Sequence, residues 1–415
     1  MSHHEQVFLS APASLWVDHT KQELKDNVRL IVKGQGVVGF RLKKQSPFEL
    51  TIINPTGKKG ITALRLSVNA KKVAYAQQQA GKWVELSSVA NVGLDKDPDC
   101  VYWFSIDYHN HYLRYGKGEV RLNTCLAEQH LPTPQAGSKR IDPYAWLNDV
   151  HQVHLDHKIV MPVRVWRDPV VIDPPLAVVS TDAIAMDDIA LNNCTVPANL
   201  TPVCRQLYAN VGGVNFQLNT PDFPNFVDAV EASIKSPNGW CYKTLKEKEG
   251  EFGPGSDPKE NYLRITMGVN QGDSPGIPYV MEIWPPGCYS PIHNHARANA
   301  IIRVLSGEIN VSLYPMLSKY HEKPFMNITF RKDQVTWISP ELNQTHKLRN
   351  PNESGPTCIT IQCYTYSEGN TEHYEYFDFL DEDGKIQQFT PNSDMGFLDF
   401  KATMKKEWES GSTRK

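Results

Sequence analysis

Short runs of alternating apolar and polar residues, separated by turn-forming residues, constrain the fold of this chain most strongly. In the first half, such runs cover residues 28–32, 48–53, 61–68 and 101–107. Alternation with a period of two places one face of a strand on a core and the other in solvent, which is typical of antiparallel sheets. We therefore expect a mainly β protein that begins with an antiparallel β-sandwich over residues 1–182.

The second half of the chain has a helical preface followed by more strand-like runs. Apolar residues recur at helical intervals over 200–208 and 226–234, and strand-like runs then include 279–284, 301–305, 309–313 and 358–364,. This pattern predicts a second β domain over residues 198–395, joined to the first by a linker over 183–197. A C-terminal tail over 396–415 follows, and its residues 400–408 have the spacing of a frayed helix.

Composition excludes several classes of protein. The 415 residues include 43 Lys and Arg against 46 Asp and Glu, giving a formal net charge of −3 without a long run of either sign. We therefore expect no nucleic-acid partner and no membrane partner. The sequence contains no signal-peptide pattern and no apolar stretch of about 18 residues, which favours a cytoplasmic protein. Its eight scattered cysteines lack CxxC spacing and are expected to be reduced,.

Three histidines form the most informative constellation. His293 and His295 are two residues apart, so in a strand both imidazoles project to the same face,. His346 lies between Pro340 and Asn350 at the predicted start of another strand. Together the three side chains could cap one face of a metal ion and leave other positions open for ligands.

The residues around these histidines resemble the two motifs of the cupin barrel. Gly287 precedes the His-x-His pair and Gly307 follows it, at the spacing of the first cupin motif. Ala300 occupies the position where many cupins have a glutamate ligand. Three neutral imidazoles without a carboxylate leave a divalent ion with its full charge, which favours an anionic ligand such as a thiolate, and a thiolate suits iron well.

Residues 197–395 also resemble the cysteine dioxygenase family of cupins, because several landmarks agree in order and spacing. They are the segments Ser236–Tyr242, Tyr262–Arg264 and Trp284–Gly287, the three histidines, and the strand that ends in Tyr364. The resemblance implies that His293, His295 and His346 bind Fe(II). It further implies that Arg264, with Tyr262 nearby, binds the substrate carboxylate, and that Tyr364 points its hydroxyl at oxygen and thiolate.

Two positions depart from that family. Mammalian-type members have a cysteine where this chain has Ala300, so a thioether crosslink to Tyr364 cannot form from that position. The family's serine–histidine–tyrosine motif is represented here by Thr360, Gln362 and Tyr364. Gln362 can donate a hydrogen bond but cannot titrate, unlike the histidine that orients the tyrosine hydroxyl in the family.

The resemblance implies an iron-dependent thiol dioxygenase that converts L-cysteine to cysteine sulfinate in cysteine and taurine catabolism. Its partners would be a small thiol and O2. One alternative is another three-histidine dioxygenase, acting on 3-mercaptopropionate, cysteamine or a ring-opening substrate. Another is a cupin binding module without catalysis, which the presence of Gln362 favours.

Weaker motifs lie in the first half. The GxGxxG run at 34–39 precedes a strand-like pattern, so no helix N-terminus is available to bind a pyrophosphate,. His109-Asn-His111 lacks the cupin glycine spacing and is interpreted as a hairpin tip. Residues 102–118 resemble the β domain named after farnesoic acid O-methyltransferases, which implies at most a binding or scaffolding module whose partner the sequence does not identify.

Overall fold

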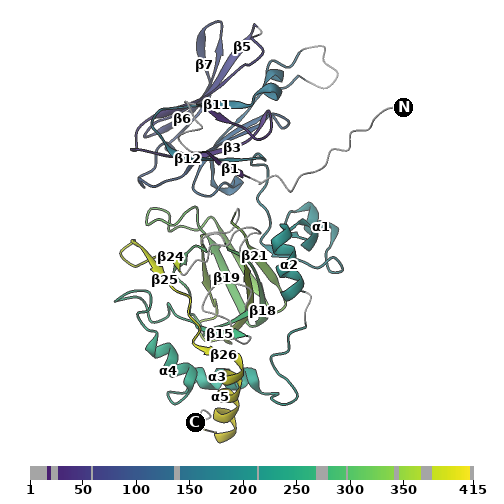
Figure 1. Cartoon of the computed structure of the whole chain (residues 1–415), viewed down its shortest axis with the longest axis vertical. Coiled ribbons are helices and arrows are strands. Elements are labelled where there is room, and N and C mark those ends of the chain that lie inside the picture. Colours follow the sequence, from purple (N-terminus) through teal and green to yellow (C-terminus); the bar gives the residue numbers. More distant parts are fainter. Residues whose placement is uncertain are drawn as a thin grey trace, which may run out of the picture. The chain divides into compact units, whose positions relative to one another are not determined.

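The chain forms two compact units, Met1–Asp173 and Pro174–Lys415 (Figure 1). The computed structural model describes residues 16–19, 27–57, 59–134, 141–212, 215–267, 279–295, 298–340, 345–365 and 376–411. Both units are mainly β, as the alternating pattern predicts. Within these ranges, no helix combines the length and the apolar character needed to cross a membrane.

The first unit is an antiparallel β-sandwich, in agreement with the prediction. Its sheets have the strand orders β1-β12-β3-β8-β9-β10 and β2-β11-β4-β5-β6-β7. Phe48 of one sheet packs against Phe40 and Tyr102 of the other, with ring centroids 5.2 and 5.5 Å apart. The elements are β1 (Trp16–His19), β2 (Asn27–Arg29), β3 (Gln35–Leu42), β4 (Phe48–Ile53), β5 (Ile61–Val68), β6 (Lys72–Gln79), β7 (Lys82–Ala90), β8 (Tyr102–Asp107), β9 (Tyr112–Lys117), η1 (Leu122–Thr124), β10 (Cys125–His130), η2 (Ala145–Asp149), β11 (Gln152–Leu155) and β12 (Ile159–Trp166).

The minor motifs of this unit have the predicted local structure. Strand β3 covers most of the GxGxxG run, so no helix begins there. His109 and His111 lie in the turn that joins β8 to β9. Neither motif therefore has the backbone geometry of a phosphate site or of a cupin metal site.

The second unit consists of two further sheets, which differs from the single cupin barrel that the motif resemblance implied. The strand orders are β14-β13-β21-β18-β23-β16-β15-β26 and β20-β19-β22-β17-β24-β25, so the strands do not close into one barrel. The strands are β13 (Ala177–Val178), β14 (Cys194–Thr195), β15 (Leu263–Met267), β16 (Tyr279–Trp284), β17 (Ile292–His293), β18 (Asn299–Ser306), β19 (Glu308–Leu313), β20 (Met326–Arg331), β21 (Val335–Ile338), β22 (His346–Arg349), β23 (Cys358–Thr365), β24 (Phe377–Leu380), β25 (Ile386–Phe389) and β26 (Met395–Gly396).

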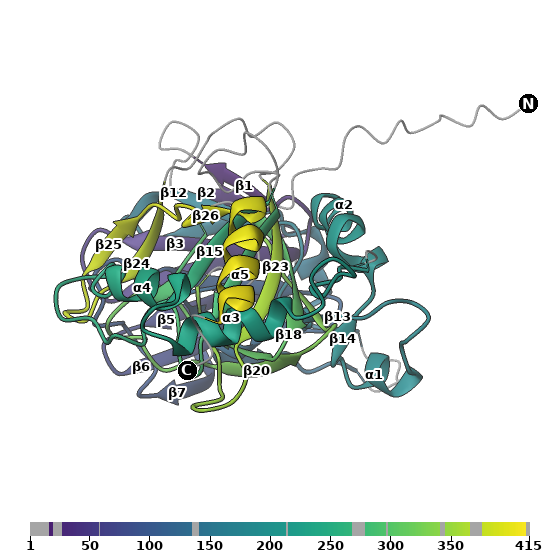
Figure 2. The same cartoon turned by 90° about the horizontal axis from the view of Figure 1, so that it is seen from below.

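Helices cover one face of the eight-stranded sheet. Helix α2 packs on β18 and β23, while α3 and α5 cross each other on the same side of that sheet (Figure 2). The helical elements are α1 (Met186–Ala190), η3 (Pro197–Asn199), α2 (Pro202–Val211), α3 (Phe226–Lys235), α4 (Trp240–Glu247) and α5 (Phe397–Ser410). The two predicted helices thus correspond to α2 and α3.

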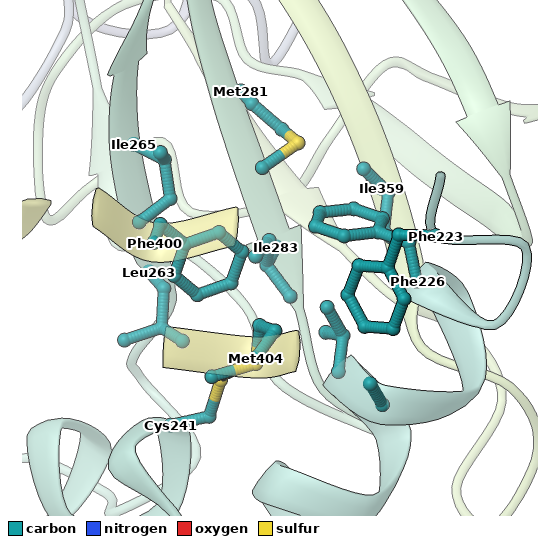
Figure 3. Close-up of a cluster of buried hydrophobic side chains, with 12 residues drawn as sticks. Phe223, Phe226, Cys241, Leu263, Ile265, Met281, Ile283, Ile359, Phe400 and Met404 are labelled. Atoms are coloured by element: carbon teal, nitrogen blue, oxygen red, sulfur yellow. Dashed lines mark hydrogen bonds between the residues drawn. The ribbon is translucent and has the colours of Figure 1, made fainter. Parts of the chain in front are cut away.

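The C-terminal segment corrects the expectation of a frayed tail. Phe400 and Met404 lie one turn apart on α5, and both are fully buried,. They join a core with Phe226 of α3 and with residues of β15 and β16, and the Met404 sulfur lies 3.8 Å from the Cys241 sulfur (Figure 3). Helix α5 is therefore part of the second unit, because it covers apolar strand residues that would otherwise face water.

The boundary between the units also differs from the expectation of a linker at 183–197. Strand β13 pairs with β14 and β21, so residues 177–178 belong to the second unit. The expected linker itself contains α1 and β14. Two-residue strands carry no periodic signal, which is why the sequence pattern placed this boundary too late.

The central strands of the eight-stranded sheet are buried on both faces. On β23, Ile359, Ile361 and Cys363 belong to the clusters beneath the helices. The alternate residues Thr360 and Gln362 project from the opposite face, which we call the inner face, and line a cavity together with residues of the six-stranded sheet. Polar residues at such buried positions mark the region where the candidate site lies.

Candidate metal centre and polar network

The six-stranded sheet brings the three predicted histidines together. His293 ends β17 and lies directly opposite His346, the first residue of β22. His295 lies two residues beyond His293, just after the strand. All three side chains are buried, and they form a group of possible metal ligands within the described residues.

The spacing of the imidazole nitrogens fits a shared metal ion. His295 Nε2 lies 3.1 Å from His293 Nε2 and 3.1 Å from His346 Nε2. Ligands at right angles around an ion, each about 2.1 Å from it, are separated by about 3.0 Å. A single ion could therefore contact all three Nε2 atoms with little movement of the rings.

Tautomer and charge also suit metal binding. His293 Nδ1 lies 3.0 Å from the Pro291 carbonyl oxygen, so it donates its proton there and leaves Nε2 as a free acceptor,. Burial lowers the pKa of His293 to about 4. Burial, followed by the neighbouring His293 and His346, lowers the pKa of His295 well below its usual value. The rings are thus neutral near pH 7, the form that ligates first-row metals.

These pKa shifts predict that the metal-free protein loses stability as the pH falls. Between about pH 6.5 and the lowered pKa of about 4, His293 binds fewer protons in the folded than in the unfolded state. Stability therefore rises with pH in this window and is lost on acidification. Denaturant unfolding of chelator-treated protein should show a loss of about 2 kcal/mol from His293 between about pH 7 and pH 5. His293→Gln should reduce the loss, and equal pH slopes for both proteins would contradict the assignment.

The eight-stranded sheet supplies a polar row on its inner face. Arg264 on β15 lies opposite Glu282 on β16, which lies opposite Thr360 on β23. Arg264 Nη1 and Glu282 Oε1 are 3.1 Å apart, and both side chains are almost fully buried. Burial raises the pKa of Glu282, while Arg264 and the Gln362 amide oppose that rise. The two side chains form a buried ion pair.

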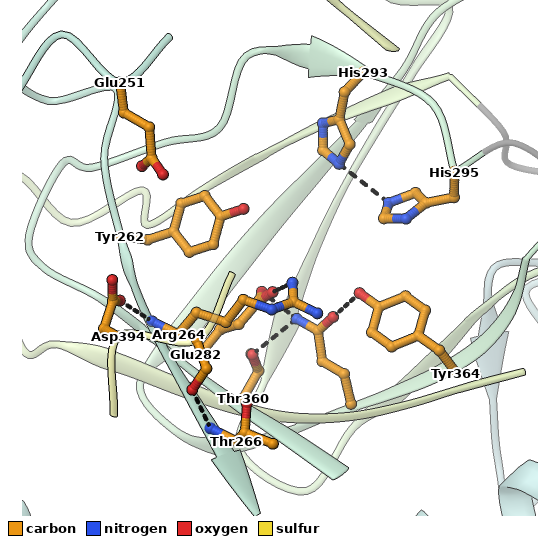
Figure 4. Close-up of polar contacts among 12 residues, drawn as sticks. Glu251, Tyr262, Arg264, Thr266, Glu282, His293, His295, Thr360, Tyr364 and Asp394 are labelled. Carbon is orange, nitrogen blue, oxygen red and sulfur yellow. Dashed lines mark hydrogen bonds and ion pairs between the residues drawn. The ribbon is translucent and has the colours of Figure 1, made fainter. Parts of the chain in front are cut away.

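Gln362 connects this ion pair to the predicted tyrosine. The Tyr364 hydroxyl donates to Gln362 Oε1, and Gln362 Nε2 donates to Glu282 Oε2. Figure 4 shows Tyr364, Thr360 and the pair of Arg264 and Glu282. Gln362 Nε2 also lies 3.3 Å from Thr360 Oγ1. Burial raises the pKa of Tyr364, so its hydroxyl stays protonated. The structure thus places Gln362 where it orients the tyrosine hydroxyl.

Three residues of this network were missed by the sequence analysis. Glu282 is an acidic residue within the otherwise apolar strand β16, which is the signal that could have identified it. Asp394 accepts a hydrogen bond of 2.7 Å from the Arg264 backbone N–H. Lys248 lies 3.1 Å from Asp394 and donates to the Tyr262 carbonyl oxygen at 3.0 Å. Asp394 and Lys248 therefore hold the segment that carries Tyr262 and Arg264.

His293 and His295 share a small cavity of about 10 Å³ with Arg264 and Glu282, which is room for about one water molecule,. The ring of Tyr262 stacks on that of Trp284, with 4.2 Å between centroids. The full lining consists of Tyr262, Arg264, Glu282, Trp284, His293, His295, Leu348, Tyr364, Phe377 and Phe389. A ligand at this place would contact aromatic rings, one ion pair and two imidazoles.

Ala300 lies beside the site but contributes no ligand. It is the cross-strand neighbour of Tyr364 between β18 and β23, and both residues are buried in one cluster. A methyl group can neither coordinate a metal nor form a thioether. The eight cysteines form no disulfide in the structure.

No family model matches the chain. Among solved structures, it is similar to the cupin domain of Cnp3 from Schizosaccharomyces pombe, with 11% identity and a TM-score of 0.20, covering 26% of this chain and 65% of that domain. An oxalate oxidase in complex with the substrate analogue glycolate has 20% identity and a TM-score of 0.21, with coverage of 28% and 55%. Galectin LEC-6 of Caenorhabditis elegans has 11% identity and a TM-score of 0.26, with coverage of 38% and 99%. The chain thus spans less than two thirds of the two cupin-containing proteins, and at these TM-scores the matches assign no function to it.

Proposed function

We propose that the second unit is an iron-dependent dioxygenase that oxidises L-cysteine to cysteine sulfinate. The observation that carries this proposal is the group of three buried imidazoles, in which His295 Nε2 lies 3.1 Å from the Nε2 atoms of both His293 and His346. No carboxylate belongs to this group in the described part of the chain. A divalent ion held there would keep its charge and favour an anionic sulfur ligand.

Fe(II), when bound, would supply the sites for thiolate and O2 and the electron transfer between them. His293, His295 and His346 would hold it from one side. Both oxygen atoms end on sulfur, so a thiol and one O2 give one sulfinic acid. The aromatic lining of the cavity would exclude water from the reacting sulfur.

The polar row on the inner face would bind and orient the substrate. Arg264 lines the cavity together with Glu282, so a substrate there would meet a guanidinium that is already paired with a carboxylate,. Tyr364 directs its own proton to Gln362, so its hydroxyl is held in a fixed orientation beside the cavity,. The reaction would take place in the cytoplasm as part of cysteine and taurine catabolism.

Oxygen uptake by the iron-loaded chain tests this proposal. We expect consumption of one O2 per sulfinate formed with L-cysteine, and a weaker or absent response with a catechol-type substrate. Turnover of the catechol in place of thiols would favour the ring-opening alternative. Absence of oxygen uptake with L-cysteine, cysteamine and 3-mercaptopropionate would overturn the proposal. Purification without stoichiometric first-row metal would favour a binding module.

A further inference from the structure

We propose that Glu282 is a specificity-determining residue that makes the site select an aminothiol through its thiol and amine and not through a carboxylate. This inference rests on the proposed thiol dioxygenase function. Glu282 acts by compensating the charge of Arg264, the residue that would otherwise bind a substrate carboxylate.

Glu282 occupies the centre of the polar row. It lies between Arg264 and Thr360 across three neighbouring strands, and its side chain is 4% exposed. Glu282 also lines the cavity beside His293 and His295. Its charge therefore acts at short range on any ligand in the cavity, without screening by bulk water.

The hydrogen bonds indicate that Glu282 is ionised. One oxygen accepts from Arg264 Nη1 (Figure 4), and the other accepts from the Gln362 amide nitrogen. Two donors on two different oxygens match a carboxylate, since a protonated acid would turn its own O–H toward one of them. The orientation of the amide agrees, because Gln362 directs its oxygen to the Tyr364 hydroxyl.

Because Glu282 neutralises the charge of Arg264, it changes which part of a substrate the site recognises. A substrate carboxylate that approaches Arg264 would also approach the carboxylate of Glu282, and like charges in a buried site repel. This repulsion largely offsets the free energy that the Arg264 guanidinium would contribute to binding of the carboxylate. A neutral amine, the form that coordinates a metal, carries no charge for either member of the ion pair to repel. The carboxylate of an aminothiol should therefore add little to its affinity.

Cysteamine and L-cysteine provide a matched pair of probes, because they differ only in the carboxylate. We would load the full chain with Co(II) and follow the thiolate-to-cobalt absorption band during titration with each thiol, a readout that needs no turnover. In the natural protein, the two dissociation constants should agree within about tenfold. L-cysteine binding more than a hundredfold tighter than cysteamine would overturn the inference, and this measurement requires no variant.

Glu282→Gln removes the charge and keeps the shape of the side chain. The preference for L-cysteine over cysteamine should rise at least tenfold in this variant, whereas Glu282→Asp should restore the natural ratio. Glu308→Gln makes the same change in an exposed pair with Arg331, where the two side chains lie 2.9 Å apart, and should leave the ratio unchanged. A general loss of folded structure would weaken the binding of both thiols equally and leave their ratio unchanged. An unchanged ratio in folded Glu282→Gln protein contradicts the role of Glu282, while absence of the thiolate band with every thiol contradicts the proposed function as well.

Discussion

His295→Ala protein should lose its metal and its activity. The Nε2 atom of His295 is the middle one of the three, at 3.1 Å from each of the others. Its removal leaves two ligands that no longer define one face of an ion, and loss even of an outer partner of a ligand typically costs about 10–100-fold in metal affinity. We expect less than about a tenth of the natural metal content after dialysis and at least about a thousandfold lower thiol-dependent oxygen uptake.

His109→Ala provides the matched control, because His109 belongs to the other His-x-His sequence of the chain, in the turn between β8 and β9. This variant should keep both metal content and oxygen uptake. Elemental analysis of the dialysed proteins and an oxygen electrode make both measurements. A His295→Ala protein that retains one metal per chain would show that the three imidazoles are not the metal centre.

Arg264→Met should strongly destabilise the second unit. The Arg264 and Glu282 side chains are 6% and 4% exposed, so removal of the guanidinium leaves a buried carboxylate without its ion-pair partner. Breaking a buried pair in this way costs about 3–5 kcal/mol. The double variant Arg264→Met/Glu282→Leu should recover most of that loss, because apolar replacement of a whole buried pair is often neutral.

The experiment is a double-mutant cycle on metal-free protein, with denaturant unfolding of the second unit as the readout. Arg331→Met breaks the exposed pair with Glu308 and should cost less than about 1 kcal/mol,. A double variant that is less stable than Arg264→Met alone would contradict a buried pair. Together with the cobalt titrations, the cycle separates the contribution of Glu282 to stability from its effect on thiol selection.

Sequence periodicity located many of the strands because each one has a buried face. The predicted runs at 48–53, 61–68 and 279–284 coincide with β4, β5 and β16. Periodicity did not predict burial where the side chains pack against segments that are distant in the sequence. The residues of α5 read as a polar tail because only two of its side chains, Phe400 and Met404, are buried, and their partners on β15 and β16 are more than a hundred residues away.

The candidate site likewise has one part that the sequence predicts and one part that it does not. His293 and His295 could be paired from the sequence, because two residues in a strand suffice to align them, and the flanking glycines and His346 followed from the motif resemblance. Glu282 could not be paired with Arg264, since nothing local shows that β15 and β16 are neighbours in the register that places these two residues opposite each other. The amino-acid sequence by itself thus identified the three candidate metal-binding histidines and the β class of both units. Tertiary structure alone decided that Arg264 is already paired, because strand pairing across distant segments sets the charge that a ligand meets.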